Sequence, residues 1–159
     1  MKNIIVLIFL VIATSCNQNA EEKSNSKIES ESANSNPISI EEIKTGYNPN
    51  GTNYNGTPLW APCIAIKFKN NSNNDYTEGN FVKGIFIRKD TNEQVGEMEV
   101  TLSTPDKPIV GGTIKKIKLQ PNYGFLVLTD VEVVVRVYIN SQLIDEYKID
   151  NKEFDADWY

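Results

Sequence analysis

The chain has 159 residues, 40% hydrophobic and 23% charged, with 16 basic residues against 21 acidic ones and a formal net charge of −5 at pH 7. This acidic balance argues against nucleic acid as a partner, because neutralising phosphates requires clustered lysine and arginine. The absence of histidine removes the usual general base, the Ser/His/Asp and Cys/His pairs and most zinc sites.

The N-terminus has the pattern of an export signal, a short positive start followed by the uninterrupted apolar run Ile4–Ala13. A helix that crosses the hydrocarbon core of a bilayer needs about 20 apolar residues, and this run is too short. Residues 1–15 are therefore predicted to be a signal sequence and not a membrane-spanning helix.

The residues that end this run, Ala13-Thr14-Ser15-Cys16, resemble the lipobox of bacterial lipoproteins, in which small residues precede an obligatory cysteine. The resemblance implies that Cys16 becomes the mature N-terminus and carries a diacylglycerol and a further acyl chain such as palmitate. Several acyl chains, at about 0.8 kcal/mol per buried CH₂, would give stable attachment to a membrane. The alternatives are an ordinary secretory signal cut nearby and an unprocessed leader.

Residues 16–36 are predicted to be the lipidated cysteine and a flexible tether, because Asn, Ser, Glu and Lys dominate this stretch. Within it, Asn19-Ala20-Glu21-Glu22-Lys23 resembles the acidic surface-export signal of Bacteroidetes-type lipoproteins. The resemblance implies a cell-envelope location in the outer membrane, extending to surface exposure. Simple solvation of a linker is the alternative role of the two acids.

Residues 37–159 are predicted to form one β-rich domain, because their apolar residues recur with period two and no helical period is sustained. In the strongest predicted strand, Glu132–Ile139, Val135 points inward and Arg136 outward. An Asn140-Ser141-Gln142 connection predicts a hairpin into the next strand. The other predicted strands are Ile38–Lys44, Cys63–Lys69, Phe81–Arg88, Val95–Leu102, Ile114–Leu119, Phe125–Leu128 and Leu143–Ile149.

About seven or eight short strands separated by turn residues suit an antiparallel β-sandwich. The strand that ends in Lys69-Asn70-Asn71-Ser72, with the later run Gly111–Pro121, resembles the immunoglobulin-like domains common in bacterial lipoproteins. The resemblance implies an immunoglobulin-like sandwich. A small β-barrel is the alternative.

No catalytic site, metal site or cofactor is predicted. Asp155 and Asp157 lie at a chain end that we expect to be exposed and mobile, whereas acid–base pairs need a desolvated seat. Cys63 lacks a histidine to activate it, and its apolar neighbours predict a small packed hydrophobe. The Asn-rich turn that ends at Asp75 lacks the acids and spacing of a calcium loop.

The segment Thr45–Ala61 is predicted to be a long loop rich in Gly, Asn and Pro, and long ordered loops often carry function. Tyr47, Tyr54 and Trp60 are its aromatic residues, and exposed rings here would make a partner-binding site. The alternative is that Trp60 covers the end of the core and both tyrosines pack on it.

The expected function is a non-catalytic binding or assembly module that is held at the cell envelope by its lipid anchor and binds a protein or glycan partner. An inhibitor or immunity lipoprotein directed at an envelope toxin or enzyme is the second hypothesis. A carboxylate-based hydrolase is the third and weakest.

The lipid anchor is directly testable. The Cys16→Ala chain should remain an unlipidated precursor or be misplaced, because the thioether that carries the diacylglycerol cannot form. Metabolic labelling with a fatty-acid analogue, followed by gel detection, measures this. Equal labelling of Cys16→Ala and wild type would refute the lipoprotein assignment.

Overall fold

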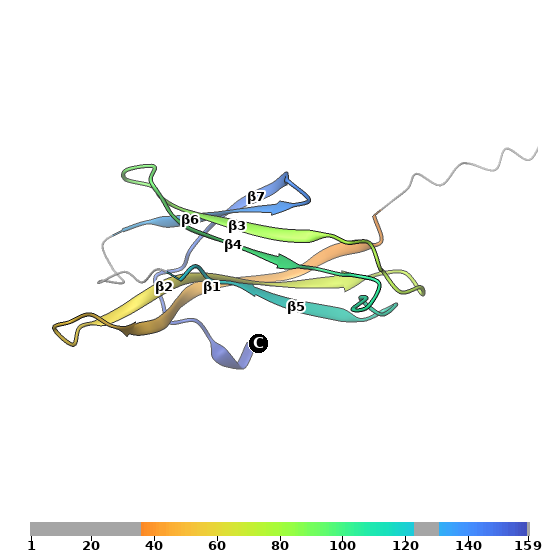
Figure 1. Cartoon of the computed structure of the whole chain (residues 1–159), viewed down its shortest axis with the longest axis horizontal. Helices are drawn as coiled ribbons and strands as arrows, with labels where there is room; N and C mark the ends of the chain where they lie inside the picture. The colour runs from red at the N-terminus through yellow and green to blue at the C-terminus, as the bar shows by residue number, and fades with distance from the viewer. Residues whose placement is uncertain (1–35, 123–130, 159) are drawn as a thin grey trace, which may run out of the picture. The chain divides into compact units, whose positions relative to one another are not determined.

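The domain consists of two antiparallel β-sheets packed against each other (Figure 1). A computed structural model describes residues 36–122 and 131–158. The predicted signal sequence, Cys16, most of the tether and the predicted strand Phe125–Leu128 lie outside these ranges. Three strands form one sheet in the order β1-β2-β5, and four form the other in the order β4-β3-β6-β7. The predicted all-β sandwich is confirmed, and the barrel alternative is wrong.

The seven strands are β1 (Ile38–Thr52), β2 (Pro58–Asn70), β3 (Phe81–Arg88), β4 (Gln94–Thr101), β5 (Ile114–Leu119), β6 (Val133–Ile139) and β7 (Gln142–Lys148). A single 3-10 turn, η1 (Ala156–Trp158), follows them. Across the described ranges, no helix has the length and apolar character needed to cross a membrane. The bounds predicted from period-two alternation for β3 and β5 are the same as those observed.

The core between the sheets follows the predicted alternation. Ile64, Ile66 and Phe68 of β2 are fully buried, as are Val135 and Val137 of β6. At Gly84 of β3 an added Cβ would lie 2.9 Å from Cδ1 of Leu119 and 3.3 Å from Cγ2 of Val135, so a larger residue here would displace core side chains between the sheets. The burial of alternate residues in β2 and β6 confirms the register predicted for these two strands.

The predicted long loop Thr45–Ala61 is wrong, because β1 and β2 continue through it as a hairpin whose turn spans residues 53–57. Pro62 lies opposite Tyr47 in the pair. The Tyr47 N–H donates away from β2, to the carbonyl of Lys152 at 2.8 Å. Tyr47 and Pro62 therefore form a pair without backbone hydrogen bonds between them. Because Pro62 has no N–H to donate, this is a position of the β1–β2 pair where proline removes no hydrogen bond.

The predicted hairpin after Ile139 is confirmed as the β6–β7 turn. Asn140 and Ser141 have φ angles of 48° and 68°, which match the two central residues of a type I′ turn. The Asn140 side-chain oxygen also accepts a hydrogen bond from the Phe81 N–H at 2.9 Å. The turn is thereby fixed to the start of β3.

The C-terminal segment is not the exposed tail that the sequence suggested. Phe154 and Trp158 are buried against Cys63 and Ala65 on the outer face of the three-stranded sheet. Asp155 and Asp157 are exposed, as expected. The segment is held to β1 by a parallel bridge between Tyr47 and Glu153.

The register of β6 predicts unequal effects of two adjacent substitutions. Val135→Asp buries a charge without a partner, and its cost of several kcal/mol is comparable with the whole stability of a small domain. Arg136→Ala removes a partly exposed ion pair with Glu146, worth under about 1 kcal/mol. Thermal unfolding of both variants checks this. Greater damage from Arg136→Ala would contradict the observed register.

Candidate functional site

The three aromatic residues proposed as a binding site are separated by the fold. Tyr47 is only 3% exposed and belongs to the core, and burial raises the pKa of its hydroxyl. Trp60 is partly buried and packs against the same core. Tyr54 is 96% exposed at the hairpin turn. The three rings therefore do not form one surface, and Tyr54 does not pack on Trp60.

The outer face of the four-stranded sheet, here called the four-stranded face, carries mixed apolar and charged rows. Residues directly opposite each other on antiparallel strands share a face. One row across the sheet consists of Leu143, Tyr138, Lys83 and Glu99, and the next of Glu146, Arg136, Ile85 and Glu97. This face includes Arg136 and Tyr138, which the sequence places outward.

A hollow of about 330 Å³ lies on the four-stranded face. Its lining consists of Phe81, Lys83, Ile85, Glu99, Tyr138, Asn140 and Ser141. Phe81 is 46% exposed. Leu143, which lies opposite Tyr138, is 50% exposed. Lys83 forms an ion pair with Glu97 at 3.0 Å, whereas Glu99 makes no ion pair among the described residues. The hollow thus combines accessible rings with a polar rim.

The outer face of the three-stranded sheet is covered by the chain itself. The Trp158 ring lies 4.7 Å from Nζ of Lys67 and 5.8 Å from Nζ of Lys116, and its indole N–H donates to Glu42 at 2.9 Å. Hydrogen bonds from Lys67 and Trp158 lower the pKa of the Glu42 carboxyl. Cys63 lies beneath this cover, where burial raises the pKa of its thiol to about 12.

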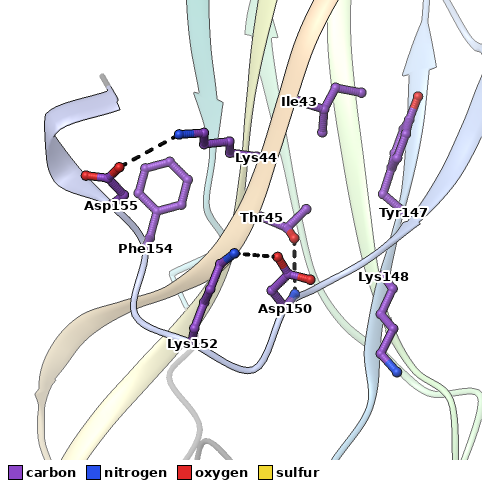
Figure 2. A pocket seen from close by; sticks show the side chains of 9 residues that line it. All are labelled: Ile43, Lys44, Thr45, Tyr147, Lys148, Asp150, Lys152, Phe154 and Asp155. Carbon is purple, nitrogen blue, oxygen red and sulfur yellow. Dashed lines mark hydrogen bonds and ion pairs between the residues drawn. The ribbon is translucent and has the colours of Figure 1, made fainter.

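A second hollow, here called the seam pocket, opens where β1 and β7, each an edge strand of its own sheet, approach each other (Figure 2). Its volume is about 440 Å³. Its lining consists of Ile43, Lys44 and Thr45 from β1, Tyr147 and Lys148 from β7, and Asp150, Lys152, Phe154 and Asp155 from the C-terminal segment.

Hydrogen bonds and ion pairs hold the C-terminal segment across the seam pocket. The Asp150 N–H donates to Oγ1 of Thr45 at 3.1 Å, and within the segment Lys152 pairs with Asp150 at 2.8 Å. Lys44 pairs with Asp155 at 3.8 Å. This pocket could not be predicted from the sequence, because it joins residues about one hundred positions apart. The described ranges hold no group of three or more Cys, Asp or Glu residues suited to bind a metal ion.

Comparison with known proteins leaves the family open. No protein-family model and no curated protein matches the chain. One solved structure that matches is a β-glucuronidase from glycoside hydrolase family 2, at 11% sequence identity and a TM-score of 0.42. The match covers 70% of this chain and 12% of that one. A likeness at this level carries no argument about function.

The C-terminal cover makes a prediction about Cys63. In a Cys16→Ser background, where Cys63 is the only thiol, native protein should react slowly with a disulfide reagent, because the thiol is buried and its pKa is about 12. Trp158→Ala should speed this reaction by about tenfold or more by opening the cover. Tyr54→Ala, at the exposed turn, is the control and should change nothing. Equal rates in folded Trp158→Ala and wild type would show that Trp158 does not shield the thiol.

Proposed function

We propose that the protein is a lipid-anchored, non-catalytic binding module of the cell envelope that holds a protein partner on its four-stranded face. One contrast carries the proposal. Phe154 and Trp158 of the C-terminal segment cover the outer face of the three-stranded sheet over Cys63 and Ala65. The four-stranded face has no such cover among the described residues, and its apolar side chains Phe81 and Leu143 remain about half exposed.

The chemistry of the four-stranded face favours a protein partner. Aromatic side chains that lie beside apolar ones and are surrounded by charges are typical of the centre and rim of protein interfaces. Tyr138 contributes a ring without belonging to the core cluster, and Ile85 is half-buried beside it. Because Arg136 and Lys83 already form ion pairs with Glu146 and Glu97, the face offers apolar contact more than net charge.

The anchoring half of the proposal rests on the N-terminal sequence. The lipobox-like Ala13–Cys16 follows a signal-length apolar run, and the polar residues 17–36 suit a tether. The antiparallel sandwich agrees with the resemblance to immunoglobulin-like domains of bacterial lipoproteins. An inhibitor of an envelope enzyme or toxin would use the same surface, so the identity of the captured partner separates these two functions.

The proposed face is tested by quantitative capture. Tagged wild-type protein is recovered from its own membranes, and the co-purified proteins are measured by mass spectrometry. Tyr138→Ala should reduce recovery of the partner by about tenfold or more, the loss expected for a central aromatic contact. Tyr138→Phe keeps the ring and should retain most of the binding.

Two outcomes would contradict this proposal. Loss of the partner from Tyr54→Ala, with Tyr138→Ala unaffected, would move the site to the exposed hairpin turn. Depletion of a bound glycan with no change in any protein would assign a glycan partner instead. Thermal unfolding of each variant verifies that the domain is intact.

A further inference from the structure

We propose that a hollow where β4 and β5 meet, here called the lysine hollow, binds a phosphate-type oxyanion through the ammonium groups of Lys107 and Lys115. The hollow has a volume of about 280 Å³, and its lining consists of Thr101, Ser103, Thr104, Asp106, Lys107 and Lys115. It shares no lining residue with the hollow on the four-stranded face. Phosphate binding therefore does not depend on the function proposed for that face.

The distribution of ion pairs singles out this part of the molecule. Among the residues that the structure describes, every basic side chain outside β5 and the loop before it pairs with a carboxylate. The basic side chains without such a pair are Lys107, Lys115, Lys116 and Lys118. On a chain with a formal net charge of −5, the uncompensated positive charge of the described part is thus confined to one strand and its approach.

Two of these four lysines interact with the C-terminal segment. Lys116 donates to a carbonyl of that segment at 2.9 Å, and Nζ of Lys118 lies 5.1 Å from the centre of the Phe154 ring. The amino groups of Lys107 and Lys115 have neither an acceptor nor a ring of this kind in the part of the chain that the structure describes, and both line the lysine hollow. These two ammonium groups are therefore available to an anion.

Lys115 occupies a position of β5 that alternation would give to an apolar residue. It lies opposite Phe68, on the same side of the sheet as the buried Ile117 and Leu119. Its side chain is half-buried and reaches the lysine hollow. Burial lowers the pKa of the Lys115 amine, and the positive charge of Lys107 lowers it further. Both effects are those of an ammonium group without a counterion, which an oxyanion would supply.

Hydroxyl groups complete the polar lining. Oγ1 of Thr104 accepts a hydrogen bond from the Lys107 backbone N–H at 3.0 Å and keeps its own O–H to donate. Thr101 adds a second hydroxyl, whereas the Ser103 O–H already donates to the Glu78 carbonyl. Two ammonium groups and two hydroxyl donors suit the several acceptor oxygens of a phosphate group, for which lysine is an established binding residue.

The size and charge of the lysine hollow define the class of ligand. A water molecule takes about 30 Å³ of liquid volume, so the hollow admits a phosphate group together with several waters. Asp106 is the one acidic residue of the lining, and within the described ranges it forms no ion pair with either lysine. The lining therefore keeps one positive charge in excess. Because the Asp106 carboxylate repels an anion, its removal should strengthen binding.

The position of the lysine hollow makes a phospholipid headgroup one source of the phosphate. β5 begins at the end of the sandwich where the described chain enters, since Asn70 donates to the Thr113 carbonyl at 3.0 Å and Asn71 donates to the Pro37 carbonyl at 2.9 Å. The tether proposed above would tie this end to the membrane. A soluble phosphate compound is the other source. Only the lipid source rests on the proposed anchoring.

The test measures the acetylation rate of individual lysines by mass spectrometry, on the full chain in nonionic detergent micelles. Inorganic phosphate is titrated while sodium chloride keeps the ionic strength constant. Acetylation of Lys107 and Lys115 should fall to a plateau, because a bound oxyanion holds both amines in their charged, unreactive form. Lys118, on the other face of β5 opposite Ala65, should keep its rate. Equal slowing of all three lysines would show general screening and overturn the proposal.

Protein variants provide the matched control. Lys107→Gln should weaken phosphate binding, read from the protection of Lys115, by about tenfold or more, because a charge-assisted hydrogen bond is lost. Lys118→Gln removes the same charge from the other face of β5 and should leave the affinity unchanged. Asp106→Asn should raise the affinity a few-fold. Thermal unfolding verifies that each variant is folded, and an unchanged affinity of folded Lys107→Gln would overturn the proposal.

Vesicles distinguish the two sources of phosphate. The full chain is bound to phosphatidylcholine vesicles with and without phosphatidic acid, whose headgroup is a phosphate monoester. Protection of Lys107 and Lys115 that requires phosphatidic acid assigns a lipid headgroup, whereas protection by inorganic phosphate alone assigns a soluble compound. Protection by neither overturns the proposal. Tyr138→Ala should leave phosphate binding unchanged, so failure of the lysine hollow is distinguishable from failure of the four-stranded face.

Discussion

Strand β2 is buried on both of its faces, and the arrangement of the domain depends on this. Its inner side chains, Ile64, Ile66 and Phe68, pack between the sheets, while Cys63 and Ala65 on its outer side lie beneath Phe154 and Trp158. The side chains of Cys63 and Ala65 are small, and the two aromatic rings pack directly on them. Backbone hydrogen bonds to Tyr47 at the edge of β1 lead the C-terminal segment onto this face.

The cover is stabilised by charge as well as by burial. Although the chain is acidic, lysines gather on the outer face of the three-stranded sheet at positions 44, 67, 69, 116 and 118. Trp158 lies among three of them, and Phe154 meets its ring edge to face at 6.4 Å between centroids. Each contact of a cation with an aromatic ring is worth roughly 0.5–1 kcal/mol when exposed, so the lysines and the aromatic cover stabilise each other.

Period-two alternation predicted the strands that have one polar and one apolar side, such as the one containing Val135 and Arg136. It failed between Thr45 and Ala61, because the Pro, Gly and Asn residues there are typical of turns and led to the prediction of a loop instead of two strands. There the pairing partner decides the structure: Pro62 is tolerated because the backbone N–H and C=O of the opposite residue, Tyr47, point away from β2. The burial of Trp158 has no periodic signal at all. The seam pocket was equally inaccessible to sequence reasoning, since residues near position 44 and near position 150 meet only in the folded chain.

The burial of Cys63 depends on the order in which parts of the domain fold. A domain with one thiol cannot protect it by an internal disulfide, and in an oxidising compartment an accessible thiol forms mixed disulfides with other proteins. The residues that shelter it, Phe154 and Trp158, follow the strand β7, so the thiol stays accessible until the segment after β7 has docked. Completion of folding and protection from cross-linking therefore coincide in a single closing step.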